Sequence, residues 1–159
     1  FFNNFLETTV LWFQDFEFNA SIYYIIRWIG FKVVGWNMIA IIGKILSLVI
    51  LIFIIMLTFF RKNKSIQQLI TTLLFGISAY YILSTTIHPW YIASPLLLSV
   101  FTKYKFPIVW SFVVVLSYSA YSNEVFSENL WLVTLEYFIV FSFFIWEFLK
   151  CKNKSIKFH

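Results

Sequence analysis

The sequence has few charged residues, few helix breakers and a single cysteine. Of its 159 residues, 12% are charged, three are proline and four are glycine, and Cys151 is the one cysteine. A lone cysteine excludes a disulfide within one copy of the chain and the usual zinc sites built from several cysteines. So small a charged fraction would leave a soluble domain of this length with too little polar surface to cover itself.

Apolar and aromatic side chains take the place of the missing charges. Hydrophobic residues make up 61% of the chain and aromatic residues 23%, and the mean hydropathy is +0.83. This composition predicts an all-α, polytopic helical membrane protein. The formal net charge of +5 would suggest nucleic acid if the basic residues shared one face, but they fall in short loops between apolar runs. We therefore expect membrane lipids, and no nucleic acid, as partners.

Apolar runs between residues 37 and 149 predict about five transmembrane helices. The runs cover 37–60, 65–86, 91–102, 106–121 and 130–149. The third run is short for a crossing, which takes roughly 20 helical residues, and its Pro95 leaves open a tilted, thinly embedded or re-entrant segment. Pro107 falls in the first turn of the fourth run, where proline is tolerated.

The first 36 residues are more mixed in polarity and predict an outer-face interfacial segment. Within it, Asn19 and Ser21 are cap formers before a short helix over Ile22–Ile29, which we expect Gly30 to end. Such a helix is too short to cross a membrane and suits the interface. A second helix is expected to start over Gly35–Asn37.

The two ends of the chain complete the predicted organisation. Residue 1 is Phe, and the residues after it resemble neither a signal peptide nor a basic leader, so we expect the chain to be the C-terminal part of a longer protein. Residues 150–159 predict a basic cytoplasmic tail that contacts anionic lipid. No linker is long enough for a separate soluble domain, so residues 1–159 are predicted to form a single membrane domain.

Loop charges assign an orientation if every run crosses. The basic residues then share one side, namely Arg61, Lys62, Lys64, Lys103, Lys105, Lys150, Lys152, Lys154 and Lys157. The acidic residues share the other, namely Glu7, Asp15, Glu17, Glu124 and Glu128. Basic loops stay cytoplasmic. A re-entrant third run would put Lys103 and Lys105 on the wrong side, so the pattern favours a crossing.

The polar segment, residues 84–91, separates the second and third runs at the predicted outer face. It carries the hydrogen-bonding residues Ser84, Thr85, Thr86 and His88, then Pro89, which breaks any helix arriving before it. It ends in Trp-Tyr, a pair favoured at a membrane-water boundary. With Asp15, Glu17, Asn19, Arg27 and Lys32, it predicts an outer membrane-level pocket. Cations beside aromatic rings suit a lipid-linked phosphate, and acids suit sugar hydroxyls.

Two stretches resemble the C-terminal half of bacterial GT-C fold glycosyltransferases, which are mannosyltransferase-like membrane enzymes. They are Asp15–Tyr23, followed by a helix, and Thr86–Tyr91 at an outer helix end. The resemblance implies transfer of a sugar, such as mannose, from a polyprenyl-phosphate donor to a glycan or lipid acceptor, with inversion of the anomeric centre. It also implies a bacterial inner membrane with the site facing the periplasm, and no cofactor besides the donor.

The same resemblance places the catalytic carboxylate in a first outer loop, which lies upstream of this sequence. The chain alone is therefore expected to be inactive, and its catalytic residue is unknown. The pocket residues are expected to bind substrate, namely His88, Trp90, Tyr91, Arg27, Lys44, Glu17 and Asn19. No spacing of His, Cys, Asp or Glu predicts a metal site.

Each candidate also has a structural interpretation. His88 either contacts the donor phosphate or an acceptor hydroxyl, or ends a helix by bonding its backbone. Trp90 and Tyr91 either stack on sugar or belong to an aromatic belt. Arg27 either binds phosphate or anchors a lipid headgroup, and capping explains Asn19 as well as substrate binding does.

Charges inside the predicted spans are functional candidates because they are costly in hydrocarbon. Lys44 lies about five residues from the outer boundary and can reach the pocket or snorkel to the interface. Glu136 is a further candidate, whereas Glu147 is expected to be solvated near the cytoplasmic end. Two other classes stay open: a transporter fragment, which would also bury charges, and a non-catalytic membrane subunit, which needs no site.

Overall fold

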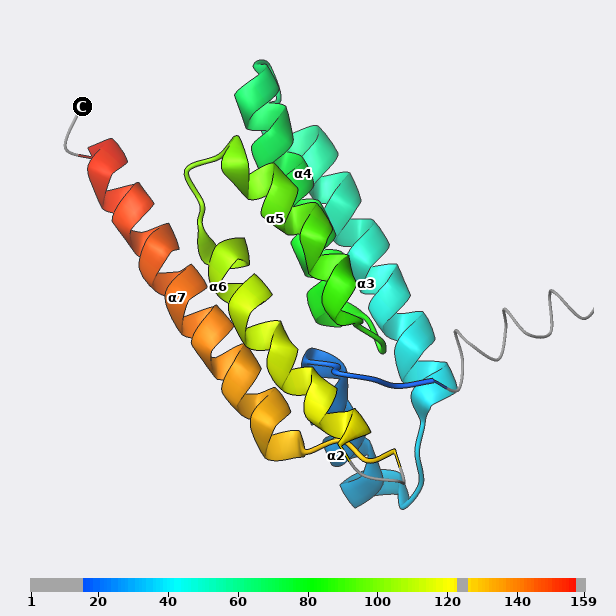
Figure 1. Cartoon of the computed structure of the whole chain (residues 1–159). Coiled ribbons are helices and arrows are strands. Elements are labelled where there is room, and N and C mark those ends of the chain that lie inside the picture. Colours follow the sequence, from blue (N-terminus) through cyan, green and yellow to red (C-terminus); the bar gives the residue numbers. More distant parts are fainter. Residues whose placement is uncertain (1–15, 123–125, 157–159) are drawn as a thin grey trace, which may run out of the picture. The chain divides into compact units, whose positions relative to one another are not determined.

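The computed structural model describes residues 16–122 and 126–156, with side chains as far as Cys151, and these residues are predominantly helical (Figure 1). The elements are α2 (Ile22–Val34), α3 (Ile39–Phe60), α4 (Ile66–Leu83), the 3₁₀ helix η1 (Pro89–Ile92), α5 (Ala93–Val100), α6 (Phe106–Val113), the 3₁₀ helix η2 (Val114–Tyr121) and α7 (Leu130–Ile156). Within the described ranges, the one β interaction is an isolated parallel bridge between Phe18 and Thr86. The all-α prediction is confirmed.

Three of these helices are long and apolar enough to cross a membrane. They are α3, α4 and the first 22 residues of α7, Leu130–Cys151. The third and fourth predicted runs form shorter apolar segments, Pro89–Val100 and Phe106–Tyr121. All five predicted runs are therefore helical, and three of them meet the length of a span.

The chain divides into two compact units, which we describe separately. Unit 1 contains residues 1–61 and 78–88, and unit 2 contains residues 62–77 and 89–159. Helix α4 contributes its first part to unit 2 and its last turns to unit 1.

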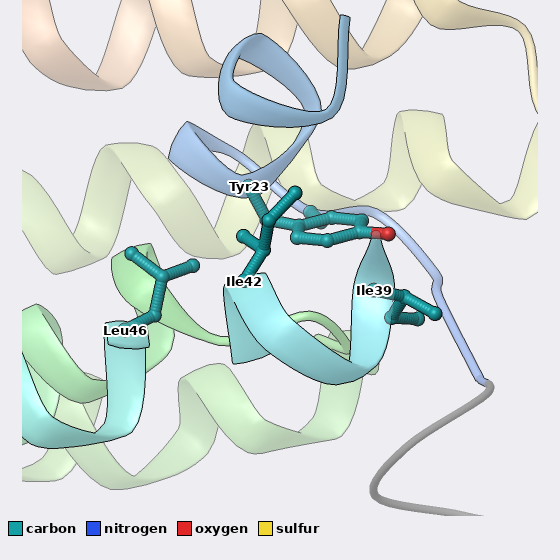
Figure 2. Packing of buried hydrophobic residues seen from close by; sticks show 5 residues of the cluster. Tyr23, Ile39, Ile42 and Leu46 are labelled. Atoms are coloured by element: carbon teal, nitrogen blue, oxygen red, sulfur yellow. The ribbon is translucent and has the colours of Figure 1, made fainter. Parts of the chain in front are cut away.

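The core of unit 1 forms where α2 packs on the first turns of α3. Ile39, Ile42 and Leu46 are buried at helical spacing, so they line one stripe of α3, and the Tyr23 ring of α2 packs on this stripe (Figure 2). Leu83, from the last turn of α4, packs against the same cluster. Most of the other α3 side chains are apolar and exposed, which is typical of a helix that faces lipid.

The predicted end of α2 at Gly30 is wrong, because the helix continues to Val34. Gly30 lies inside the helix, where a Cβ added to it would be 3.9 Å from the Cδ1 atom of Ile42. Gly35 ends the helix instead. Its φ of 85° is left-handed and its N–H donates to the Phe31 carbonyl over 3.0 Å. Gly35 therefore terminates α2 rather than starting the next helix, which begins at Ile39.

Unit 2 is built around the antiparallel pair α6 and α7, which run side by side (Figure 1). The rings of Phe106 and Phe144 meet at 5.0 Å and those of Trp110 and Tyr137 at 6.2 Å, both edge-on. Edge-to-face aromatic pairs of this kind stabilise packing beyond the apolar area that they bury. The short elements η1 and α5, which precede α6 in the chain, pack on α6.

A buried acid joins α6 to α7. Trp110 and Glu136 are both fully excluded from solvent, and the indole Nε1 donates to the Glu136 carboxylate over 3.1 Å. Removing either partner would leave the other polar group buried in an apolar setting. Within unit 2, Glu136 therefore has a structural role in fixing the pairing of α6 with α7.

The expectation that Glu147 is solvated is wrong, because this residue is only 6% exposed. Its carboxylate accepts hydrogen bonds from the backbone N–H groups of Lys105 and Phe106, at 2.7 to 3.0 Å. These N–H groups begin α6 and have no partner within the helix, so Glu147 caps α6 from α7. The Lys105 ammonium donates in turn to the carbonyls of Ser99 and Thr102 at the end of α5.

Candidate functional site

The predicted outer pocket begins where residues 16–21, which we call the strap, meet the polar segment. The Phe18 N–H donates to the Thr85 carbonyl over 3.1 Å, and the Ile87 N–H donates to the Phe18 carbonyl over 2.8 Å. The Thr86 hydroxyl donates to the Phe16 carbonyl over 2.8 Å. These bonds join two segments that are far apart in sequence. The polar segment is therefore fixed to the strap by two backbone hydrogen bonds and one from a side chain.

Hydrogen bonds within the polar segment and a close approach to α3 also fix its conformation. The Ser84 hydroxyl donates to the Thr86 carbonyl over 3.0 Å and accepts from the Thr86 N–H, which closes a tight turn after α4. A Cβ placed on Gly43 would lie 3.7 Å from the Thr85 methyl group, so the turn approaches α3 closely at that glycine. The turn therefore sits beside the second turn of α3 in unit 1.

Asn19 makes the bend that leads from the strap into α2. It is fully buried and its φ of 47° is left-handed, a conformation that asparagine adopts more readily than most residues. Ser21 occupies the N-cap position but makes no side-chain cap hydrogen bond. Ser21 thus holds the predicted cap position without a side-chain cap bond, and Asn19 contributes a left-handed backbone turn just before it.

His88 lies against the strap rather than in open solvent. It is 7% exposed, and its ring packs at 5.2 Å from the Phe18 ring and 6.2 Å from the Phe16 ring. Burial lowers the pKa of His88 below its ordinary value, so the imidazole is neutral at neutral pH. A neutral imidazole can donate and accept one hydrogen bond each, but it does not supply a positive charge to a phosphate.

Glu17 and Arg27 form an ion pair that links the strap to α2. Their side chains are 24% and 21% exposed, so the pair sits at the edge of the buried region. The Arg27 guanidinium also lies 4.6 Å from the centre of the Tyr24 ring. The charge of Arg27 is therefore balanced inside the protein, while its planar fork carries more N–H donors than the bond to Glu17 uses.

Tyr23 places a hydroxyl next to this ion pair. The hydroxyl donates to the Asn37 side-chain carbonyl over 3.2 Å. Burial, together with the neighbouring Glu17 carboxylate, raises the pKa of Tyr23 well above its ordinary value. The phenol is thus a neutral donor at any physiological pH. Tyr23 and Asn37 were not predicted as site residues, although a polar Asn at the start of the longest apolar run was a usable signal.

The other predicted site residues lie elsewhere. Lys44 is exposed on α3, and Lys32 lies 5.9 Å above the Trp28 ring on α2. Trp90 and Tyr91 form part of η1 in unit 2, where their rings meet edge-on at 6.1 Å and Trp90 is exposed. Asp15 lies outside the described residues. Unit 1 thus brings together Glu17, Asn19, Arg27 and His88, and their role in binding substrate stays a prediction.

The described part of the chain contains no group of three or more His, Cys, Asp or Glu side chains that could hold a metal ion. Comparison with protein-family models, with curated proteins and with solved structures finds no match for this chain. The fold and site define a helical protein with three apolar helices of membrane-spanning length and a polar cluster at one end of α3. Function has to be inferred from the chemistry of that cluster.

Proposed function

We propose that this chain is the C-terminal part of a GT-C type membrane glycosyltransferase that moves a sugar from a polyprenyl-phosphate donor to a glycan or lipid acceptor. The supporting observation is the polar cluster of unit 1, where Glu17 of the strap pairs with Arg27, the Tyr23 hydroxyl bonds Asn37, and the His88 ring packs on the strap. The cluster lies at the first turns of α3, the most apolar of the candidate spans. A lipid-linked sugar has to be handled at such a boundary, because its chain stays in hydrocarbon.

The residues of the cluster suit distinct parts of that substrate. The guanidinium of Arg27 suits the donor phosphate, since a guanidinium pairs with phosphate oxygens in two places. The Glu17 carboxylate, partly exposed, suits sugar hydroxyls as an acceptor. The neutral His88 ring and the Phe16 ring that it stacks on suit an apolar contact with one face of a sugar ring. In the transfer, the bond from the sugar C1 to the phosphate oxygen breaks and a bond to the acceptor oxygen forms, while the acceptor proton passes to a carboxylate upstream of this chain.

The proposal includes five crossings, with residues 1–36 outside and residues 150–159 in the cytoplasm of a bacterial inner membrane. Segment lengths support the fourth crossing, because 3₁₀ turns rise further per residue than α turns. With η2 following α6, Phe106–Tyr121 extends about 28 Å, close to the roughly 30 Å of a hydrocarbon core. Pro89–Val100 extends about 20 Å and requires local thinning of the bilayer. The alternation of basic and acidic loops supports the orientation.

A charge swap in the full-length parent tests whether the ion pair serves substrate or only structure. Membrane vesicles would be assayed for transfer of radiolabelled sugar from polyprenyl-phosphate donors at matched expression. Glu17→Gln and Arg27→Gln should each reduce transfer at least about tenfold, the effect of losing one charged contact to substrate. The double variant Glu17→Arg with Arg27→Glu restores an ion pair but should stay defective.

The matched control for the swap is Lys64→Gln, an exposed lysine between α3 and α4, which should transfer at the wild-type rate. A thermal midpoint in detergent equal to that of the wild type would show that the swapped protein is folded. Recovery of transfer in the swapped protein would mean that the pair is structural, and the proposed binding role would fail.

A further inference from the structure

Helix α2 carries an apolar face that the described residues of unit 1 leave uncovered. Ile25, Trp28 and Ile29 fall on one side at helical spacing and are 62%, 64% and 49% exposed. The opposite side, with Tyr23 and Gly30, packs on α3. An exposed cluster of large apolar side chains on one face marks an interaction surface rather than a solvated one.

The charges of α2 are asymmetric. Over Ile22–Val34 the helix carries Arg27 and Lys32 and no acid. Arg27 is on the packed side and its charge is balanced by Glu17. Lys32 is on the open face, in the last turn, with its ammonium 5.9 Å from the Trp28 ring. Lys32, and not Arg27, is therefore the cation that α2 presents outward.

The position of α2 in the chain identifies what covers this face. Only residues 35–38 separate α2 from α3, the most apolar span, and the left-handed Gly35 turns the chain between them. A helix joined by so short a linker to the N-terminal end of a span lies at the level of the lipid headgroups. There tryptophan is favoured, apolar side chains reach the upper acyl chains, and lysine reaches phosphate.

We propose that α2 lies in the plane of the membrane interface, and that Lys32 and Trp28 together form a contact site for the phosphate of an anionic phospholipid. Lipid is the expected occupant, because the open face combines exposed aromatic and aliphatic side chains with a cation, and α2 itself carries no acidic residue. This inference rests on the membrane part of the proposed function and is independent of sugar transfer.

The test uses single-cysteine labelling of the full chain in lipid vesicles. Cys151→Ser removes the one native cysteine. An environment-sensitive NBD dye is then attached at Ile25→Cys or Ile29→Cys. Ile52→Cys, exposed midway along α3, is the deep-membrane control, and Lys64→Cys is the aqueous control. The α2 labels should emit between the two controls and be quenched by lipids with a nitroxide near the headgroup more strongly than by lipids with a deep nitroxide.

Lipid preference tests Lys32 itself. The ratio of quenching by nitroxide phosphatidylglycerol to quenching by nitroxide phosphatidylcholine reports which lipid neighbours the Ile29→Cys label. The ratio should favour the anionic lipid by about fivefold and fall to about one in Lys32→Gln, the effect of one lysine near an anionic surface. The matched control Lys64→Gln should leave the ratio unchanged.

Three results would overturn the inference. Aqueous emission at both α2 positions would show a solvated face. Apolar emission without quenching by either lipid would show that protein covers the face, whether residues 1–15 or another chain. A quenching ratio of about one with native Lys32 would show that α2 has no site for an anionic headgroup. Failure of the Ile52→Cys label to meet lipid would instead contradict the membrane assignment itself.

Discussion

His88 belongs to the polar segment and is buried against the strap, so its protonation would place a charge beside the rings of Phe16 and Phe18. Its pKa is lower in the folded protein than in the unfolded chain, because burial disfavours the imidazolium. The unfolded chain therefore takes up more protons as the pH falls below the ordinary histidine value of about 6.5. The stabilisation from His88 is fully present above that value and is lost as the pH falls towards the folded pKa.

This linkage predicts a pH-dependent stability that depends on one residue. The thermal midpoint of the protein in detergent should fall between about pH 7 and pH 5, and His88→Gln should flatten that part of the curve. Parallel curves for the two proteins would show that His88 is not the group that titrates.

Glu147 is a second residue whose role depends on its partners and not on its neighbours in sequence. Its position near the end of the last apolar run is typical of a solvated acid, and no local pattern indicates that the first N–H groups of α6 point at it. A cap that comes from another helix requires knowledge of how α6 and α7 align. The sequence pattern could therefore predict both helices but not this contact.

Removal of the cap should destabilise unit 2. Glu147→Ala takes the acceptor from the N–H groups of Lys105 and Phe106 and should cost about 2 kcal/mol of unfolding free energy, the usual loss for an N-cap. Chemical unfolding in mixed micelles would measure this change, with the exposed Ser142→Ala on the same helix as the control. An equal effect for the two variants would show that the cap contributes nothing.

At the scale of elements, apolar runs predicted every long helix because a span needs one feature, an uninterrupted apolar stretch of sufficient length. Helix ends were predicted less well. Gly30 and Gly35 are equally good stop signals in sequence, but only Gly35 takes the left-handed conformation that ends α2, whereas Gly30 stays inside the helix near Ile42. The switch from α6 to the 3₁₀ helix η2 had no recognised signal either, although it changes how far that segment reaches.

At the scale of the whole molecule, loop charges and the positive-inside rule predicted that the strap and the polar segment share a side. The structure pairs them directly through Phe18 and Thr86. Which residues would meet, and that Arg27 would be balanced by Glu17, could not be predicted, because register and ion pairing depend on the backbone path. The role of the cluster in sugar transfer is a proposal from residue chemistry and resemblance, and a direct assay tests it.

That assay should use the full-length parent in sealed vesicles of known orientation, supplied with radiolabelled polyprenyl-phosphate sugars and with acceptors confined to one side. We predict labelled product only where the acceptor meets the outer face, the predicted side of the strap and of His88. Product formed only on the cytoplasmic side, or no product with any polyprenyl donor, would contradict this prediction.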